Sequence, residues 1–186
     1  MKTHQRGKTD NFGHHRTAKM AVQSHRNSTS WFSMVHEIAK PDWEIRNLYS
    51  LPMFHVATVP LVHAGPLRAG STCYIMRRFE LEAYLAAIER HKITMLGMVP
   101  PLVIAVLMSP LRHKYSLRSV RRVGCGAAPL DEDSGERLKE LCAPDCTFTQ
   151  VQGMTETTGA ISLFYSPDED DTGSVGNTFM PNTDVK

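Results

Sequence analysis

Residues 150–159, with the sequence QVQGMTETTG, are the stretch that decides the fold. They combine two amide side chains, a flexible glycine, three hydroxyls and one carboxylate. A second stretch, GCGAAPL at residues 124–130, carries mostly small side chains. Hydroxyls can face a phosphate and a carboxylate can face a metal ion, whereas small side chains leave the backbone bare for a flat ring. Together the two stretches indicate a site for a ligand that has both a phosphate and a ring.

Strand-like runs alternate with helical periodicity around these stretches. We predict strands at residues 72–76, 93–96, 120–123, 146–150 and 160–164. After the first strand, apolar residues recur at the spacing of an amphipathic helix, with Glu and Arg on the other face: Leu81, Tyr84, Leu85 and Ile88. Pro101 is placed to open a helix that runs to about residue 108. The acidic residues 131–133 are placed to open another, through residue 141.

This alternation predicts an α/β fold, with βαβ units around a mainly parallel sheet. Ligands of such sheets bind beyond the carboxyl ends of the strands. Residues 124–130 and 151–159 each follow a predicted strand as a loop. The topology therefore places both loops where a nucleotide would bind.

Composition narrows the class of protein. A chain of 186 residues is long enough for one domain with a core. Its 41% hydrophobic and 22% charged residues argue against wholesale disorder. Residues 1–26 are basic, and basic arms can bind nucleic acid or anionic membranes. We interpret this segment as a solvated terminus and expect no nucleic-acid partner.

The four cysteines, at positions 73, 125, 142 and 146, form no Cys-x-x-Cys pair and follow no secretory signal. Reduced thiols in an intracellular protein are therefore expected, with Cys142 and Cys146 structural at a helix-to-strand turn. His14, His15 and His25 lack partners at ligand spacing, so we expect no zinc site there. The apolar run at residues 95–108 contains two prolines and is shorter than the ~20 residues of a membrane helix. We expect it to be core.

The two stretches, in this order, resemble the nucleotide site of the AMP-forming acyl-CoA synthetase family, the adenylating enzymes that include 4-coumarate–CoA ligases and luciferases. The resemblance runs from about Lys19 to the end of the chain. It implies a partial large N-terminal domain of the adenylate-forming fold. It also implies that a carboxylic acid and ATP give an acyl-adenylate and pyrophosphate, and that CoA then forms a thioester.

By this resemblance, Thr155 would contact the α-phosphate and Glu156 would bind Mg²⁺. His55, within LPMFH at residues 51–55, would orient the carboxylate and gate the acyl tunnel. The residues expected to bind the nucleotide are Gly126, Ala127, Ala128, Pro129, Gln152, Gly153, Met154, Thr155 and Lys19. Ordinary alternatives remain open. Glu156 would then be a surface acid on a turn, residues 126–129 a tight strand-to-helix turn, and His55 a hydrogen-bonded core residue.

The chain departs from the family pattern at two places. Gln152 stands where the family carries an aromatic residue on adenine, and an amide gives up stacking of ~1–3 kcal/mol per base. The family's phosphate loop is rich in Ser, Thr and Gly and ends in Pro-Lys, but here residues 13–19 read GHHRTAK. Histidine and arginine cannot form the backbone cradle that glycine allows. We therefore expect a degenerate loop, with Lys19 a weaker phosphate ligand.

We expect two parts: a basic segment with the degenerate loop at residues 1–30, and a partial AMP-binding domain at 31–186. The predicted function is that of an acyl-CoA ligase-like adenylation domain fragment, with ATP or AMP, Mg²⁺ and CoA implied. Full turnover by the chain alone is not expected. The alternative is a non-catalytic remnant that binds a nucleotide or acyl group, or that associates through exposed sheet edges, with a full-length relative as one partner. Cytoplasmic and peroxisomal locations both remain open.

Overall fold

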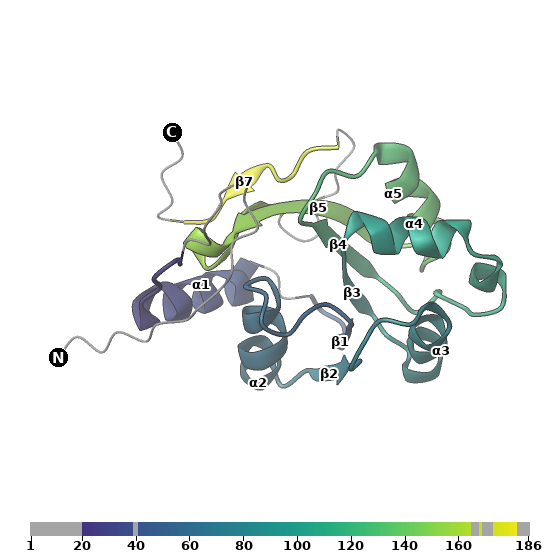
Figure 1. The fold of residues 1–186 in the computed structure, drawn as a ribbon, viewed down its shortest axis with the longest axis horizontal. Helices are drawn as coiled ribbons and strands as arrows, with labels where there is room; N and C mark the ends of the chain where they lie inside the picture. The colour runs from purple at the N-terminus through teal and green to yellow at the C-terminus, as the bar shows by residue number, and fades with distance from the viewer. Residues whose placement is uncertain (1–19, 39–40, 165–167, 169–172, 182–186) are drawn as a thin grey trace.

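The computed structural model describes residues 20–38, 41–164, 168 and 173–181, which build a seven-stranded sheet (Figure 1). The strand order is β2-β1-β3-β4-β5-β6-β7. The strands are β1 (Arg46–Tyr49), β2 (Thr72–Ile75), β3 (Met95–Met98), β4 (Arg122–Gly126), β5 (Thr147–Met154), β6 (Gly159–Leu163) and β7 (Thr178–Phe179). Strands β1 to β5 are parallel, whereas β6 and β7 run antiparallel to their neighbours. The prediction of an α/β fold around a mainly parallel sheet is confirmed.

The handedness of the crossovers decides where the helices lie. The helices are α1 (His25–Ile38), α2 (Gly65–Ala69), α3 (Leu81–His91), α4 (Pro100–Met108) and α5 (Glu132–Lys139). The connections through α3, α4 and α5 all step across the sheet in one direction, and the connection through α2 steps in the other. Because such crossovers are right-handed, α3, α4 and α5 lie on one face and α2 on the opposite face. Figure 1 shows this arrangement, with α1 on the side of α2.

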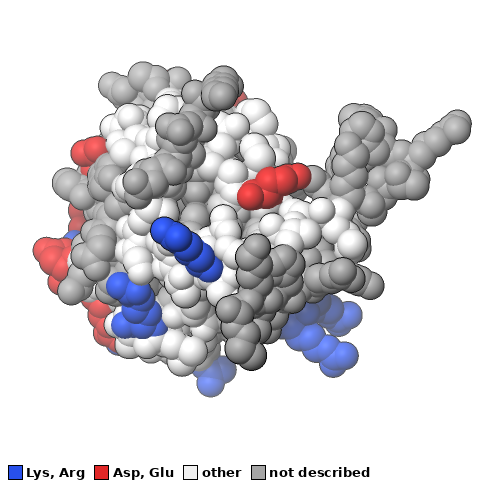
Figure 2. Space-filling view, turned by 90° about the vertical axis from the view of Figure 1, so that its left-hand side faces the viewer, with Lys and Arg blue, Asp and Glu red and all other residues white. Residues whose placement is uncertain are grey.

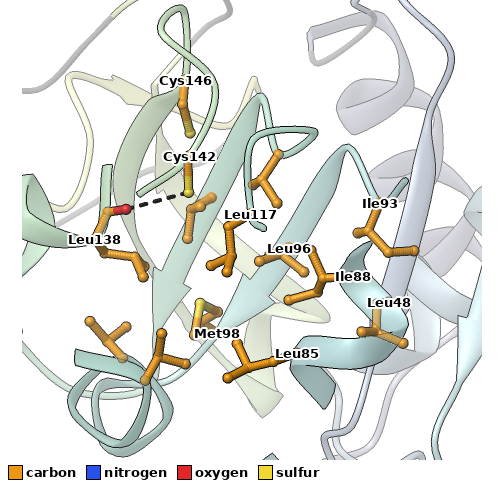
Figure 3. Packing of buried hydrophobic residues seen from close by; sticks show 14 of the residues in the cluster. Leu48, Leu85, Ile88, Ile93, Leu96, Met98, Leu117, Leu138, Cys142 and Cys146 are labelled. Atoms are coloured by element: carbon orange, nitrogen blue, oxygen red, sulfur yellow. Dashed lines mark hydrogen bonds between the residues drawn. The ribbon is translucent and has the colours of Figure 1, made fainter. Parts of the chain in front are cut away.

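The hydrophobic core fills the space between the sheet and α3, α4 and α5. Every second residue of β3 and β4 is buried, which is the period of a strand with one face on a core. Figure 3 shows Leu96 and Met98 of β3 packed near Leu85 and Ile88 of α3. All four side chains are at most 3% exposed. Much of the apolar run at residues 95–108 is therefore in the core, as expected, although Ile104 and Met108 are exposed.

Helix α3 matches its prediction closely. Tyr84, Leu85 and Ile88 are buried, as the apolar spacing requires. Glu80 directly precedes the helix, and its carboxylate accepts hydrogen bonds from the backbone N–H groups of Glu82 (3.0 Å) and Ala83 (2.6 Å). This N-cap satisfies donors that the first turn leaves free.

The N-terminus of α5 also confirms a prediction. Asp131 caps this helix, because its carboxylate accepts a hydrogen bond of 2.8 Å from the Ser134 N–H. That bond holds the pKa of Asp131 below its usual value. The helix ends at Lys139, two residues before the predicted end.

Two strands begin later in the chain than predicted. Strand β3 starts at Met95 because Lys92, with a φ of 49°, ends α3 and the Ile93 N–H still bonds to Ile88 O. Strand β4 starts at Arg122 because the Val120 N–H bonds to Leu117 O in a turn. Ile93 and Val120 are buried outside the strands, so their apolar character was a misleading guide to the strand ends.

Strand β5 extends further than predicted. Residues 152–154 were expected in a loop, but they continue β5 and pair with β6 in an antiparallel hairpin. Gln152 pairs with Ser162, and Gly153 pairs with Ala160 after a bulge. Only Thr155–Thr157 form a turn, as one 3₁₀ helix. The predicted loop after this strand is therefore a β-hairpin with a short tip.

Helix α1 was not anticipated, because residues 1–30 show no clear periodicity. It begins at His25 and crosses residue 30, the expected boundary between the two parts of the chain. The division at that residue remains a prediction, as does the degenerate phosphate loop, because residues 13–19 lie outside the described part of the chain.

Cys142 and Cys146 are structural, as predicted. Both are at most 2% exposed, in the turn between α5 and β5. The Cys142 thiol donates a hydrogen bond of 3.4 Å to Leu138 O, and Figure 3 shows the two cysteine side chains pointing toward each other.

A buried amide connects β5 to the loop that follows β4. Gln150 is 5% exposed, and its Oε1 accepts a hydrogen bond of 2.9 Å from the Leu130 N–H. Its Nε2 donates to Leu130 O at 3.0 Å and lies 3.4 Å from Gly173 O. One side chain therefore satisfies both backbone groups of a buried residue and fixes the end of the loop at residues 127–130.

No helix among the described residues is long and apolar enough to cross a membrane. Figure 2 shows the face on the side of α1, where Lys, Arg, Asp and Glu are scattered over a mainly uncharged surface.

Replacing Gln150 with Leu should destabilise the chain. The substitution leaves the N–H and the C=O of Leu130 buried and unpaired, which costs about 2–4 kcal/mol of unfolding free energy. Gln152→Leu is the matched control, since Gln152 is exposed and the change should stay within about 0.5 kcal/mol. Urea unfolding of both variants measures the difference. Equal unfolding free energies would contradict the role assigned to Gln150.

Only one cysteine should react quickly with a thiol reagent in the folded chain. Cys73 is partly exposed, whereas the other three are buried. Burial raises the pKa of Cys125 to about 11. The hydrogen bond with Cys142, and then burial, raise the pKa of Cys146. At pH 8 we expect one fast equivalent that Cys73→Ser removes, and three more after unfolding. Two or more fast equivalents in the native chain would refute this.

Candidate functional site

The predicted site residues that the structure describes lie along one edge of the sheet. Because β1, β3, β4 and β5 are parallel, their carboxyl ends share that edge. His55 follows β1, residues 127–130 follow β4, and Thr155 and Glu156 form the turn at the end of β5. Gly126, the last residue of β4, pairs with Val151 on the neighbouring strand, and β5 continues for three more residues to Met154.

The loop at residues 127–130 presents small side chains at this edge. Ala127, Ala128 and Pro129 are exposed, whereas Leu130 is buried. Ala127 has a φ of 74°, a left-handed conformation that costs a non-glycine residue about 1–3 kcal/mol. The Gln150 bonds and the start of α5 hold the loop in this shape. Backbone groups and a flat apolar surface are thus fixed in place, as contact with a ring requires.

Gly126 was expected in this loop but is the last residue of β4. A Cβ atom there would lie 3.0 Å from Val151 Cγ1 and 3.2 Å from Val151 O. Packing against β5 therefore accounts for this glycine on its own. Its contact with a nucleotide stays a prediction.

The β5–β6 hairpin depends on a second close approach. A Cβ on Gly153 would overlap the carbonyl oxygen of Gly159 and lie 2.9 Å from Ala160 Cα. A side chain at position 153 would therefore separate the two strands. We predicted that Gly153 binds the nucleotide, but the hairpin already requires a glycine at this position. Met154, next in the strand, is 44% exposed.

The hairpin turn uses its hydroxyl groups differently. Thr157 Oγ1 lies 3.0 Å from Met154 O and 2.9 Å from Gly159 O, so this hydroxyl closes the turn. Thr155 is held through its carbonyl oxygen, which accepts from the Thr158 N–H (3.2 Å) and from the side-chain amide of Gln23. The turn is therefore built from Thr157 and from the backbone of Thr155, and the Thr155 hydroxyl can serve a ligand.

Thr158 was not singled out by the sequence analysis. It is 5% exposed, has a φ of 72°, and its buried hydroxyl has no hydrogen-bond partner among the described residues. The sequence of a hydroxyl-rich turn does not reveal which hydroxyl finds a hydrogen-bond partner, because that depends on how the turn folds. For Gln150 we likewise predicted only a position at the end of a strand, and not its hydrogen bonds to Leu130.

Glu156 stands exposed on the turn beside Thr155. No group of three His, Cys, Asp or Glu side chains that could hold a metal ion occurs in the described part of the chain. Mg²⁺ binds proteins through one or two carboxylates and completes its shell with phosphate oxygens and water. A single carboxylate next to a hydroxyl-rich turn is compatible with Mg²⁺ coordination of this kind. The described residues at this edge do not supply enough ligands for a metal ion held by protein groups alone.

His55 lies in an exposed loop and is not a core residue. Its Nδ1 accepts a hydrogen bond of 3.2 Å from the Ala57 N–H. The other ring nitrogen, Nε2, is therefore the one that can donate to a ligand. Thr58, buried just after it, holds the loop through its hydroxyl, which lies 2.7 Å from His55 O.

Gln152 and Lys19 complete the predicted set. Gln152 is exposed on β5, one residue before Gly153, on the same edge as residues 127–129. Lys19 lies outside the described residues, so its role as a phosphate ligand stays a prediction.

A cavity of about 660 Å³ lies elsewhere in the fold. Residues of α1, α2 and β1 contribute to its lining, which includes Trp43, Asn47 and Tyr49. None of the predicted site residues lines it. The candidate site is therefore an open edge and not this cavity.

Comparison with known proteins assigns the family. The family model for AMP-binding enzymes matches residues 17–186. An acyl-CoA synthetase of Alternaria alternata is 55% identical over 170 residues, which cover 90% of this chain and 29% of that protein. A phenylacetyl-CoA ligase of Aspergillus niger is 40% identical over 165 residues, covering 88% of this chain and 30% of that ligase. The chain thus spans less than a third of the length of these relatives.

The fold agrees with this assignment. The structure of a long-chain-fatty-acid–CoA ligase from Archaeoglobus fulgidus superimposes with a TM-score of 0.78 at 22% identity, over 90% of this chain and 35% of that one. The sheet is accordingly part of the N-terminal domain fold of adenylate-forming enzymes. Because the family model matches most of this chain, at residues 17–186, the chain belongs to the family of AMP-binding enzymes.

Proposed function

We propose that the chain forms the nucleotide-handling part of a carboxylate-activating ligase. In the proposed reaction, a carboxylate oxygen attacks the α-phosphorus of ATP, and pyrophosphate leaves. The acyl-adenylate then reacts with the CoA thiol, which forms the thioester and releases AMP. The observation that supports this most is the pairing of Gly126 with Val151, because the small-residue loop and the hydroxyl turn then follow neighbouring parallel strands at the same edge of the sheet.

The proposed contacts divide between the small-residue loop and the hydroxyl turn. The adenine ring lies against residues 127–129, whose exposed small side chains allow close approach to the backbone. Gln152 stacks its amide on the ring, and Gly153 and Met154 contribute backbone atoms. The Thr155 hydroxyl donates to an α-phosphate oxygen. Glu156 binds the Mg²⁺ ion, whose charge neutralises the phosphates during transfer.

The acyl substrate is a carboxylic acid, as the names of the relatives suggest. In this proposal His55 donates from Nε2 to the carboxylate, since its Nδ1 accepts from the Ala57 N–H. Ala57 and Val59, together with Val99 and Pro100 after β3, are the proposed lining for the acyl chain.

A second candidate function is binding without turnover. The outer edge of β2 favours it, because within the described residues this strand pairs only with β1. Ile75 on that strand is 53% exposed, so a hydrophobic strand edge is open to association. In this alternative the chain binds a nucleotide or an acyl group, or pairs with a longer relative.

ATP–pyrophosphate exchange tests the primary proposal. With Mg²⁺ and a panel of aryl and fatty acids, we expect exchange that Glu156→Ala reduces by about 100-fold, because one charge stabiliser of the transferring phosphate is lost. Glu140→Ala, at the exposed end of α5, should retain full exchange. Nucleotide binding without exchange for any acid would reject turnover and favour the second candidate.

His55 can be tested separately from the nucleotide. His55→Ala should raise KM for the acid by about tenfold, the value of one hydrogen bond to a charged group, and leave KM for ATP unchanged. The control is His113→Ala, since His113 is also exposed but lies before β4, at the opposite edge. An unchanged KM for every acid would remove His55 from the site.

A further inference from the structure

Helix α1 and the residues just before it contact the β5–β6 hairpin at two places. Just before the helix, the Gln23 side-chain amide donates to Thr155 O at the turn. Within the helix, the indole Nε1–H of Trp31 donates a hydrogen bond of 2.9 Å to Ala160 O on β6. Figure 1 shows α1 beside this hairpin, at the end of the sheet. One short segment of chain therefore contacts both the tip and the second strand.

The Trp31 ring also packs directly on the strand. Trp31 is 6% exposed. A Cβ atom on Gly159 would lie 2.8 Å from both Cε2 and Cζ2 of the indole. The glycine therefore lets the ring lie against the backbone of β6, next to the hydrogen bond to Ala160. Ring contact and hydrogen bond together fix the strand in two directions.

The position of the turn follows from the position of this strand. Ala160 pairs with Gly153, and Gly159 pairs with Met154, immediately before Thr155. Thr157 Oγ1 lies 2.9 Å from Gly159 O, so the turn is bonded to the residue on which the indole packs. β4 ends at Gly126, opposite Val151, so residues 152–157 at the tip of the hairpin extend beyond the pairing with β4. The contact with α1 therefore helps to fix where the side chains of Thr155 and Glu156 stand.

We infer that Trp31 is a positioning residue of the nucleotide site: it holds the hairpin that presents Thr155 and Glu156. The inference rests on the proposed function for the role of these two residues. The contact of Trp31 with the hairpin does not depend on that function. A ligand that binds at the turn should therefore change the environment of the indole, and a substitution of Trp31 should change the affinity for that ligand.

The chain offers a matched control in its other tryptophan. Trp43 is partly buried, with the Arg121 guanidinium 5.4 Å from its ring centre, and lies near the start of β1. The site lies at the opposite ends of the strands. Trp31→Phe and Trp43→Phe make the same chemical change, but only Trp31→Phe removes a bond to the hairpin.

Hydrogen exchange of the full chain tests the contact without any ligand. In Trp31→Phe we expect the amides of β6 to exchange about tenfold faster relative to those of β3, because a buried hydrogen bond and part of a ring are lost. In Trp43→Phe the ratio between β6 and β3 should remain that of the natural chain. Equal ratios in the two variants would overturn the inference.

Equilibrium dialysis with ATP and Mg²⁺ tests the consequence for the site. We expect Trp31→Phe to weaken binding by about fivefold and Trp43→Phe to leave it unchanged. ATP should also change the fluorescence of Trp43→Phe, in which Trp31 alone emits, but not that of Trp31→Phe. Unchanged affinity in Trp31→Phe, or a silent Trp31, would reject its role at the site.

The two proposals fail in different ways. If the natural chain binds no ATP, the proposed function fails, and the exchange ratios alone decide whether Trp31 holds the hairpin. If ATP binds and both tryptophan variants behave alike in every measurement, the nucleotide site stands and Trp31 has no part in it.

Discussion

The direction of the crossovers is the constraint on which the rest of the structure depends. Three successive connections, through α3, α4 and α5, return on the same face of the sheet. Parallel strands result, and every strand from β1 to β5 must then end at one edge. Residues that stand far apart in the chain, such as His55 and Glu156, share that edge for this reason alone. The core between the sheet and the three helices fixes the arrangement.

The sequence was sufficient where a pattern repeats locally. Tyr84, Leu85 and Ile88 predict α3 because one face of a helix must be buried, and Asp131 predicts the start of α5 because free N–H groups need an acceptor. Strand ends were predicted less well. Ile93 and Val120 are as buried as strand residues, yet backbone hydrogen bonds place both of them in turns.

The features that escaped prediction depend on contacts between distant segments. The extension of β5 through Met154 requires a partner strand, and the close approach of Gly153 to Gly159 is visible only once that strand is placed. Helix α1 likewise packs through Trp31 on residues about 130 positions later. For the site, composition indicated phosphate and ring contacts. It could not indicate that the Gln150 side chain bonds to the backbone of Leu130, or that the Thr157 hydroxyl is already hydrogen-bonded within the turn.

The left-handed backbone of Ala127 has a consequence for how the site responds to heat. A loop that folds against its own conformational preference stores free energy, which is released when the loop opens. Its shape is therefore conditional on Gln150 and on the capped end of α5. When warming loosens either support, this loop gives way before the sheet beneath it does. Glycine at position 127 would relax the loop, and it would also let the loop adopt many shapes in place of one.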